Sequence, residues 1–192
     1  VGVFNPQITI AYAEGDKEKL VDIIKSCNRI LIFIMSIPIA FLTAYGRDFY
    51  ALWQPTKDPD MLQRLSLLAV GVLYVSMSIQ VLYHVFIITK KVKWNSLVVL
   101  GSGICSSLLS LILLSKTDLG VACFPLSSMI TGVLRNMIFT PIYAARCLEI
   151  RWNRFYSDIF LGFASIGTIT VLGLLSRMIV PIHSWIILLL TG

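Results

Sequence analysis

The sequence predicts an all-α polytopic membrane protein whose helices pack as a bundle. Of its 192 residues, 57% are hydrophobic, and the mean hydropathy of +0.83 is well above that of a soluble domain. All ten acidic residues fall between the long apolar stretches or at their ends. Most of those stretches approach the ~20 residues that a helix needs to cross ~30 Å of hydrocarbon. Because lipid offers no hydrogen-bond partner to the backbone, such segments must be helical.

Five complete spans are expected, with part of a span at each end. Residues 1–13 resemble the last turns of an arriving helix and 185–192 the start of another, so we expect a piece of a longer, transporter-sized protein. A buried helix of a soluble protein can also be apolar all round, but five in succession favour a single transmembrane bundle. The complete spans are expected at 28–45, 65–88, 94–114, 120–143 and 159–175.

The connectors between these spans divide unequally in positive charge. Three of them hold ten Lys and Arg residues and the other three hold five. The positive-inside rule places the richer set in the cytoplasm. The net charge of +6 then follows from topology and from attraction to anionic membrane lipids, and no nucleic-acid partner is expected. The richer connectors are 14–29, 89–93 and 144–156, and the poorer ones are 46–64, 115–119 and 176–184.

The first connector contains an amphipathic segment, Glu14–Lys25. Its Leu20, Ile23 and Ile24 recur at helical spacing among charged residues. We expect this segment to lie at the membrane interface and to lead into the first span.

Residues that support catalysis or metal binding show no recognisable pattern. The four cysteines form no close pair, and neither histidine has a second ligand at metal-binding spacing. No connector offers paired carboxylates or a His–Asp pair for acid–base chemistry. We therefore expect no enzyme, no cofactor and no metal site.

The third span carries a run of small residues. Gly103 and Ser107 are four residues apart, as are Ser106 and Ser110. Small residues at this spacing let helix backbones approach closely, so Gly103 is expected to lie against a neighbouring helix.

The second span has a polar stripe. Ser76, Gln80 and His84 share one helical face because they are four residues apart. Two interpretations remain open: the stripe faces a cavity, or it hydrogen-bonds to neighbouring helices.

The fourth span contains the one ionisable residue deep within an apolar stretch. Ser128, Thr131 and Arg135 share a face, with Asn136 on the adjacent strip, and Arg135 lies eight residues before Tyr143, or ~12 Å at helical rise. An ionisable residue at such depth usually faces a bundle interior or a water-filled cavity on a substrate path. The alternative is that its long stem carries the charge back to the interface.

A series of short motifs in residues 4–155 points to a known family. Phe4-x-Pro6 precedes Tyr12-Ala13-x-Gly15-Asp16, and the longest motif, Asn136-Met-Ile-Phe-Thr-Pro-Ile-Tyr-Ala-Ala-Arg146, closes the fourth span. With these motifs, and with Leu20, Ser26, Arg29, Ile37-Pro38 and Leu52-Trp53, the chain resembles the C-terminal half of a bacterial oligosaccharide flippase. These Wzx-like polysaccharide transporters belong to the multidrug/oligosaccharidyl-lipid/polysaccharide exporter superfamily. Pro55 departs from the family, in which a Gly is common there.

The resemblance implies two helical lobes around a cavity that opens alternately to each side of the cell membrane. This chain would supply most of the second lobe and pack against a missing N-terminal lobe. It would translocate a lipid-linked oligosaccharide for surface polysaccharide assembly. The alternative is a cation-coupled multidrug antiporter, which needs carboxylates inside the membrane, and none is expected here. The candidate substrate-path residues are Arg135, Asn136, Thr131 and Ser128 in the cavity wall, and Asn28 and Arg29 at a cytoplasmic mouth.

Overall fold

The computed structural model describes residues 5–179, which form helices joined by short connectors, without strands in this range. Five helical stretches are long and apolar enough to cross a membrane, so the chain is an all-α polytopic membrane protein. The expected partial span at 185–192 and the first four residues lie outside the described part. The five stretches are Lys17–Trp53, Pro59–Ile79, Val92–Lys116, Gly120–Cys147 and Trp152–Ile179.

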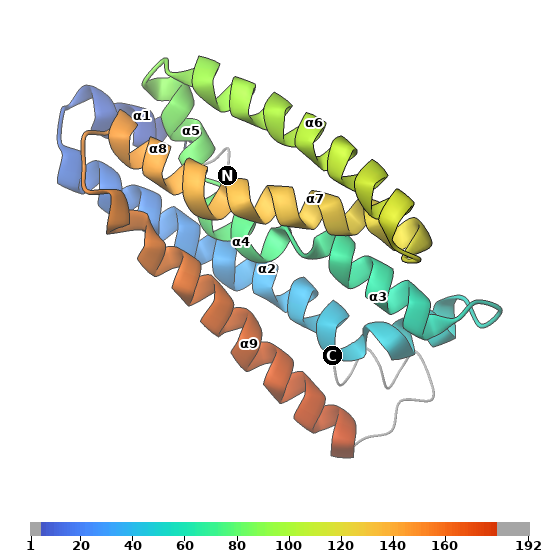
Figure 1. The fold of residues 1–192 in the computed structure, drawn as a ribbon. Helices are drawn as coiled ribbons and strands as arrows, with labels where there is room; N and C mark the ends of the chain where they lie inside the picture. Colours follow the sequence, from blue (N-terminus) through green and yellow to red (C-terminus); the bar gives the residue numbers. More distant parts are fainter. Residues whose placement is uncertain (1–4, 180–192) are drawn as a thin grey trace.

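Two long helices run side by side along one flank of the bundle (Figure 1). Helix α2 (Lys17–Trp53) contacts α9 (Tyr156–Ile179) along most of its length. Near one end of the contact Asn28 donates a hydrogen bond to Asp158, and near the other end Asp48 forms an ion pair with Arg177. Because both partners advance together along the sequence, the two helices are parallel, as expected for the first and fifth of five successive crossings. Helix α6 (Val92–Lys116) lies on the opposite flank, against α7 (Cys123–Leu134).

The segment predicted to lie at the interface is the first part of α2. Asp16 caps the helix by accepting a hydrogen bond from the Lys19 amide at 3.0 Å. Leu20 and Ile24 then point into the protein core and are almost fully buried. Their apolar surface therefore packs on other helices of the same chain, and the expected position of the segment at the membrane interface stays a prediction. Gly15, at φ +77°, makes the turn from α1 (Asn5–Ala13).

The second expected span is not one continuous helix. It consists of α3 (Pro59–Val70), α4 (Leu73–Ser76), the 3₁₀ turn η2 (Met77–Ile79) and α5 (Leu82–Ile88). The first break falls at Gly71, where a Cβ would come within 2.6 Å of Met129 Cγ on α7. The Met129 side chain thus packs directly over this glycine, a residue type with low helix propensity, inside the span.

The packed core lies at the end of the bundle where α1, α2, α5 and α8 (Thr140–Cys147) meet η5 (Trp152–Phe155). Its largest fully buried side chains include Phe86 and Phe155. The three connectors with the Lys and Arg excess adjoin this end. The chain therefore has one well-packed end that coincides with its positively charged end.

Helix α6 packs through a different face from the one expected. A Cβ on Gly103 would meet no atom within 4 Å, so the prediction that Gly103 lies against a neighbour is wrong for the described part of the chain. Ser106 Oγ instead lies 3.2 Å from Ser128 Oγ of α7, and Ser110 is buried. The small-residue contact is real, but it follows Ser102, Ser106 and Ser110 around the helix.

Candidate substrate-path site

A π-helical turn interrupts the fourth span and separates α7 from α8. This turn, η4, covers Arg135–Phe139, and the Thr140 amide donates to the Arg135 carbonyl five residues back. Pro141 has no N–H to donate to the Met137 carbonyl, which accepts a hydrogen bond from the Tyr156 hydroxyl of α9 at 2.8 Å instead. Such turns are rare and frequently mark functional sites.

Arg135 begins this turn and reaches across to α6. Its Nη1 donates to Ser102 Oγ at 3.1 Å, and its Nε donates to Asn136 Oδ1 at 3.2 Å. Asn136 Oδ1 also accepts from the Tyr83 hydroxyl at 3.0 Å, and Asn136 is only 1% exposed. Among the described residues, no carboxylate forms an ion pair with Arg135. The guanidinium is therefore held by neutral oxygens.

The side chain of Arg135 does not extend far toward the positively charged end of the bundle. The start of α6 and the end of α8 both lie at the positively charged end of the bundle. Ser102 is ten residues from the start of α6, or about 15 Å, and Arg135 is twelve residues from Cys147 at the end of α8, or about 18 Å. The anchor and the arginine are therefore at similar depth. This geometry favours a guanidinium fixed between helices over one that returns to the interface.

The other candidates divide between two places. Thr131 donates to the Ser127 carbonyl of its own helix, and the exposed Ser128 faces Ser106, so both belong to the α6–α7 side together with Arg135. Asn28 is inside the bundle, at 0% exposure and bonded to Asp158, in place of the mouth position expected for it. Arg29 is exposed. The structure thus groups Arg135 with Asn136, Ser128 and Thr131 and separates Asn28 from them.

A cavity of about 670 Å³ opens between α2 and the α3–α4 region. Its wall is largely apolar, and Ser76 and Gln80 supply polar groups to it. His84 does not line it, because its Nε2 lies 3.5 Å from Thr9 Oγ1 of α1. The polar stripe of the second span therefore serves both purposes considered for it: two members face a cavity and the third contacts another helix.

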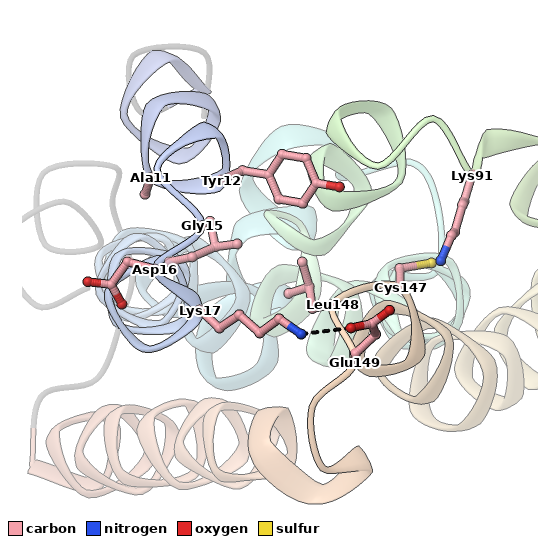
Figure 2. A pocket seen from close by; sticks show the side chains of 10 residues that line it. Ala11, Tyr12, Gly15, Asp16, Lys17, Lys91, Cys147, Leu148 and Glu149 are labelled. Atoms are coloured by element: carbon pink, nitrogen blue, oxygen red, sulfur yellow. Dashed lines mark hydrogen bonds and ion pairs between the residues drawn. The ribbon is translucent and has the colours of Figure 1, made fainter.

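A smaller pocket of about 180 Å³ lies where the three positively charged connectors meet (Figure 2). The Lys17 ammonium pairs with the Glu149 carboxylate at 2.8 Å across it, and Lys91 lines the opposite wall beside Cys147. The hydrogen bond and charge of Lys17, with a contribution from Lys91, hold the pKa of Glu149 below its ordinary value. The sequence did not single out this pocket, although its charge count assigned all three connectors to one side.

The pocket has an unusual backbone. Lys90 and Glu149 both adopt φ of +56°, a left-handed conformation that non-glycine residues rarely occupy. Such conformations persist where surrounding contacts over-determine them, and they cluster at functional sites. Here the Tyr143 hydroxyl donates to the Lys91 carbonyl at 3.0 Å and helps to fix one of the two turns.

Comparison with known proteins gives one distant relative. The chain is 26% identical over 190 residues to a protein of Bacillus subtilis (strain 168) named uncharacterized membrane protein EpsK. The match covers 99% of this chain and 37% of that protein, so the chain spans little more than a third of its relative. No family model matches, and no solved structure is similar. The relative supports the membrane character of the chain and says nothing of a substrate.

Proposed function

We propose that this chain forms part of a flippase that moves a lipid-linked oligosaccharide across the cytoplasmic membrane for surface polysaccharide assembly. In this proposal the chain contributes most of one lobe, and the central cavity alternates its opening between the two sides. The observation that carries it is Arg135, a guanidinium at depth in a span. Ser102 and Asn136 anchor it, and no acid among residues 5–179 forms an ion pair with it. The family resemblance of the sequence agrees with this role.

The chemistry of the cargo explains why such an arginine is useful. A lipid-linked oligosaccharide commonly carries a pyrophosphate, which must pass through a region that solvates anions poorly. The planar guanidinium can hold two phosphate oxygens at once, which an ammonium cannot. Ser102 and Asn136 hold the arginine in place, and the Tyr83 hydroxyl in turn donates to Asn136. On the cytoplasmic side, Lys91 offers positive charge to an arriving anionic head, whereas Lys17 is already paired with Glu149.

Surface polysaccharide in cells that depend on the complete protein tests the proposal. Arg135→Ala should abolish or sharply reduce it while leaving protein abundance near normal. Arg135→Lys should recover part of the activity, because lysine keeps the charge but loses the bidentate geometry. Arg151→Ala is the matched control, since Arg151 is exposed in a connector. Full activity of Arg135→Ala would contradict the proposal.

A cation-coupled multidrug antiporter is the second candidate, and one observation favours it. Asp158 was expected at a span end, yet it lies inside the bundle at 1% exposure. A carboxyl enclosed in the membrane domain is the feature that such an antiporter needs. Efflux of cationic dyes from cells that carry the complete protein separates the two candidates: Asp158-dependent efflux with unchanged polysaccharide would favour the antiporter.

A further inference from the structure

Asp158 is a buried carboxyl group that forms no ion pair with any residue that the structure describes. It lies in the first turn of α9, where Asn28 Nδ2 of α2 donates to its Oδ2 at 3.2 Å. Asp48, at the other end of the α2–α9 contact, differs because it pairs with Arg177 at 2.8 Å. A charged carboxylate enclosed in this way is costly unless it is paired.

The side-chain oxygen of Asn28 lacks a hydrogen-bond donor in the described part of the chain. The residue is 0% exposed, so this oxygen, Oδ1, lies inside the bundle. A carboxylate beside it cannot help, because an ionised carboxyl group only accepts hydrogen bonds. A buried acceptor without a donor is destabilising. If Asp158 were ionised, the pair would thus carry an unpaired negative charge, and Asn28 Oδ1 would lack a hydrogen-bond donor among the described residues.

We propose that Asp158 and Asn28 form a proton-binding site, in which the carboxyl group is protonated in this conformation. A proton from water joins the carboxylate, which removes the charge and creates an O–H that donates to Asn28 Oδ1. Asn28 Nδ2 continues to donate to the carbonyl oxygen of the acid. A neutral acid and an amide therefore satisfy each other through two hydrogen bonds. On release the O–H bond breaks, and the proton returns to water.

The groups around the pair do not replace that proton. From α2, the positive charges of Lys25 and Arg29 favour the ionised carboxylate, as does a hydrogen bond from the Ser157 side chain of α9. Lys25 is only half-buried and Arg29 is exposed, however, and neither forms an ion pair with Asp158. From η5, Arg154 is engaged with Glu18 at 2.6 Å. One turn further along α9, Gly162 lies against the buried hydroxyl of Ser78, which is neutral and also lacks a partner among the described residues.

The consequence is a proton-dependent contact between two parallel spans. The neutral pair joins α2 to α9 inside the bundle, whereas the charged carboxylate is stable only where water reaches it. Loss of the proton should therefore favour separation of these helices near Asn28. This inference is independent of the cargo named above, because it depends only on the Asp158 environment.

Infrared spectroscopy of the purified complete protein tests the site. The wild type should show a protonated-carboxyl band that persists at neutral pH and disappears in Asp158→Asn. The matched control, Asp118→Asn, removes an exposed acid in a connector and should leave the band unchanged. Asn28→Ala should move the band, because the acid loses the amide to which it donates. Identical bands in the wild type and Asp158→Asn would overturn the proposal.

The melting temperature of Asp158→Asn provides a second test of the protonated state. An asparagine at position 158 can both donate to and accept from Asn28, as the neutral acid does, so Asp158→Asn should fold and should melt within a few degrees of the wild type. Failure of this variant to fold would show that the negative charge is needed, and would also overturn the proposal.

Discussion

Gly132 offers a quantitative test of how the fourth span packs on the second. It is buried in α7, and a Cβ at this position would lie 2.5 Å from Val72 Cγ2 and 3.4 Å from Val72 Cβ. Valine is stiff at χ1, and its Cβ cannot rotate away. Gly132→Ala must therefore push the two spans apart. Gly103 is the matched control, because a Cβ there meets no atom within 4 Å.

The expected magnitude follows from two opposing terms. Overpacking of a close contact costs about 1–3 kcal/mol. Alanine recovers up to about 1 kcal/mol through its higher helix propensity. Gly132→Ala should therefore lower the free energy of unfolding, by about 1 kcal/mol at the middle of these ranges and by no more than about 3 kcal/mol. Gly103→Ala retains only the favourable term, so it should leave stability unchanged or raise it by up to about 1 kcal/mol.

Unfolding of the complete protein in detergent, followed by circular dichroism, measures the difference. The predicted order of stability places Gly103→Ala at or above the wild type and Gly132→Ala below it. If Gly132→Ala proves as stable as the wild type, the described contact between Gly132 and Val72 is incorrect.

Two further predictions concern the positively charged end. Single cysteines can be introduced at Lys19, Lys91 or Gln54 in a background without the native cysteines. In intact cells, those at Lys19 and Lys91 should be protected from an impermeant thiol reagent, and the one at Gln54 should react. The opposite pattern would show that the predicted topology is inverted. Lys17→Gln should lower the melting temperature at neutral pH, because Lys17 holds the pKa of Glu149 below its ordinary value. A carboxyl group whose pKa is lowered by folding stabilises the protein at pH values above its unfolded-state pKa, and this stabilisation is lost as the pH falls through its folded-state pKa. The difference in melting temperature between Lys17→Gln and the wild type should therefore shrink in acid. A deficit that does not change with pH would show that the ion pair contributes nothing.

Hydrophobicity was sufficient to locate the long apolar helices. All five helical stretches overlap expected spans, because the cost of exposing backbone and charge to lipid acts on each segment alone. The interruption of the second span could not be read in the same way. It depends on Met129, which approaches Gly71 from a helix far along the chain.

Rotation and pairing of the helices were harder to predict for a related reason. Helix α6 is apolar on nearly every side, so the sequence could not show that Ser106 and not Gly103 faces α7. The burial of Asp158 depends on Asn28, 130 residues away in the sequence. Arg135 could be identified from the sequence because a charge inside a span stands out by itself, but its anchor, Ser102, could not.

The central claim is that Arg135 receives the anionic head of a lipid-linked oligosaccharide. The most direct test is translocation of such a lipid, with a diphosphate linkage, in liposomes that contain the purified complete protein. We predict that Arg135→Ala reduces the rate to that of protein-free liposomes, whereas Arg151→Ala retains the wild-type rate. Equal translocation by Arg135→Ala and the wild type, or no translocation by the wild type, would contradict the claim.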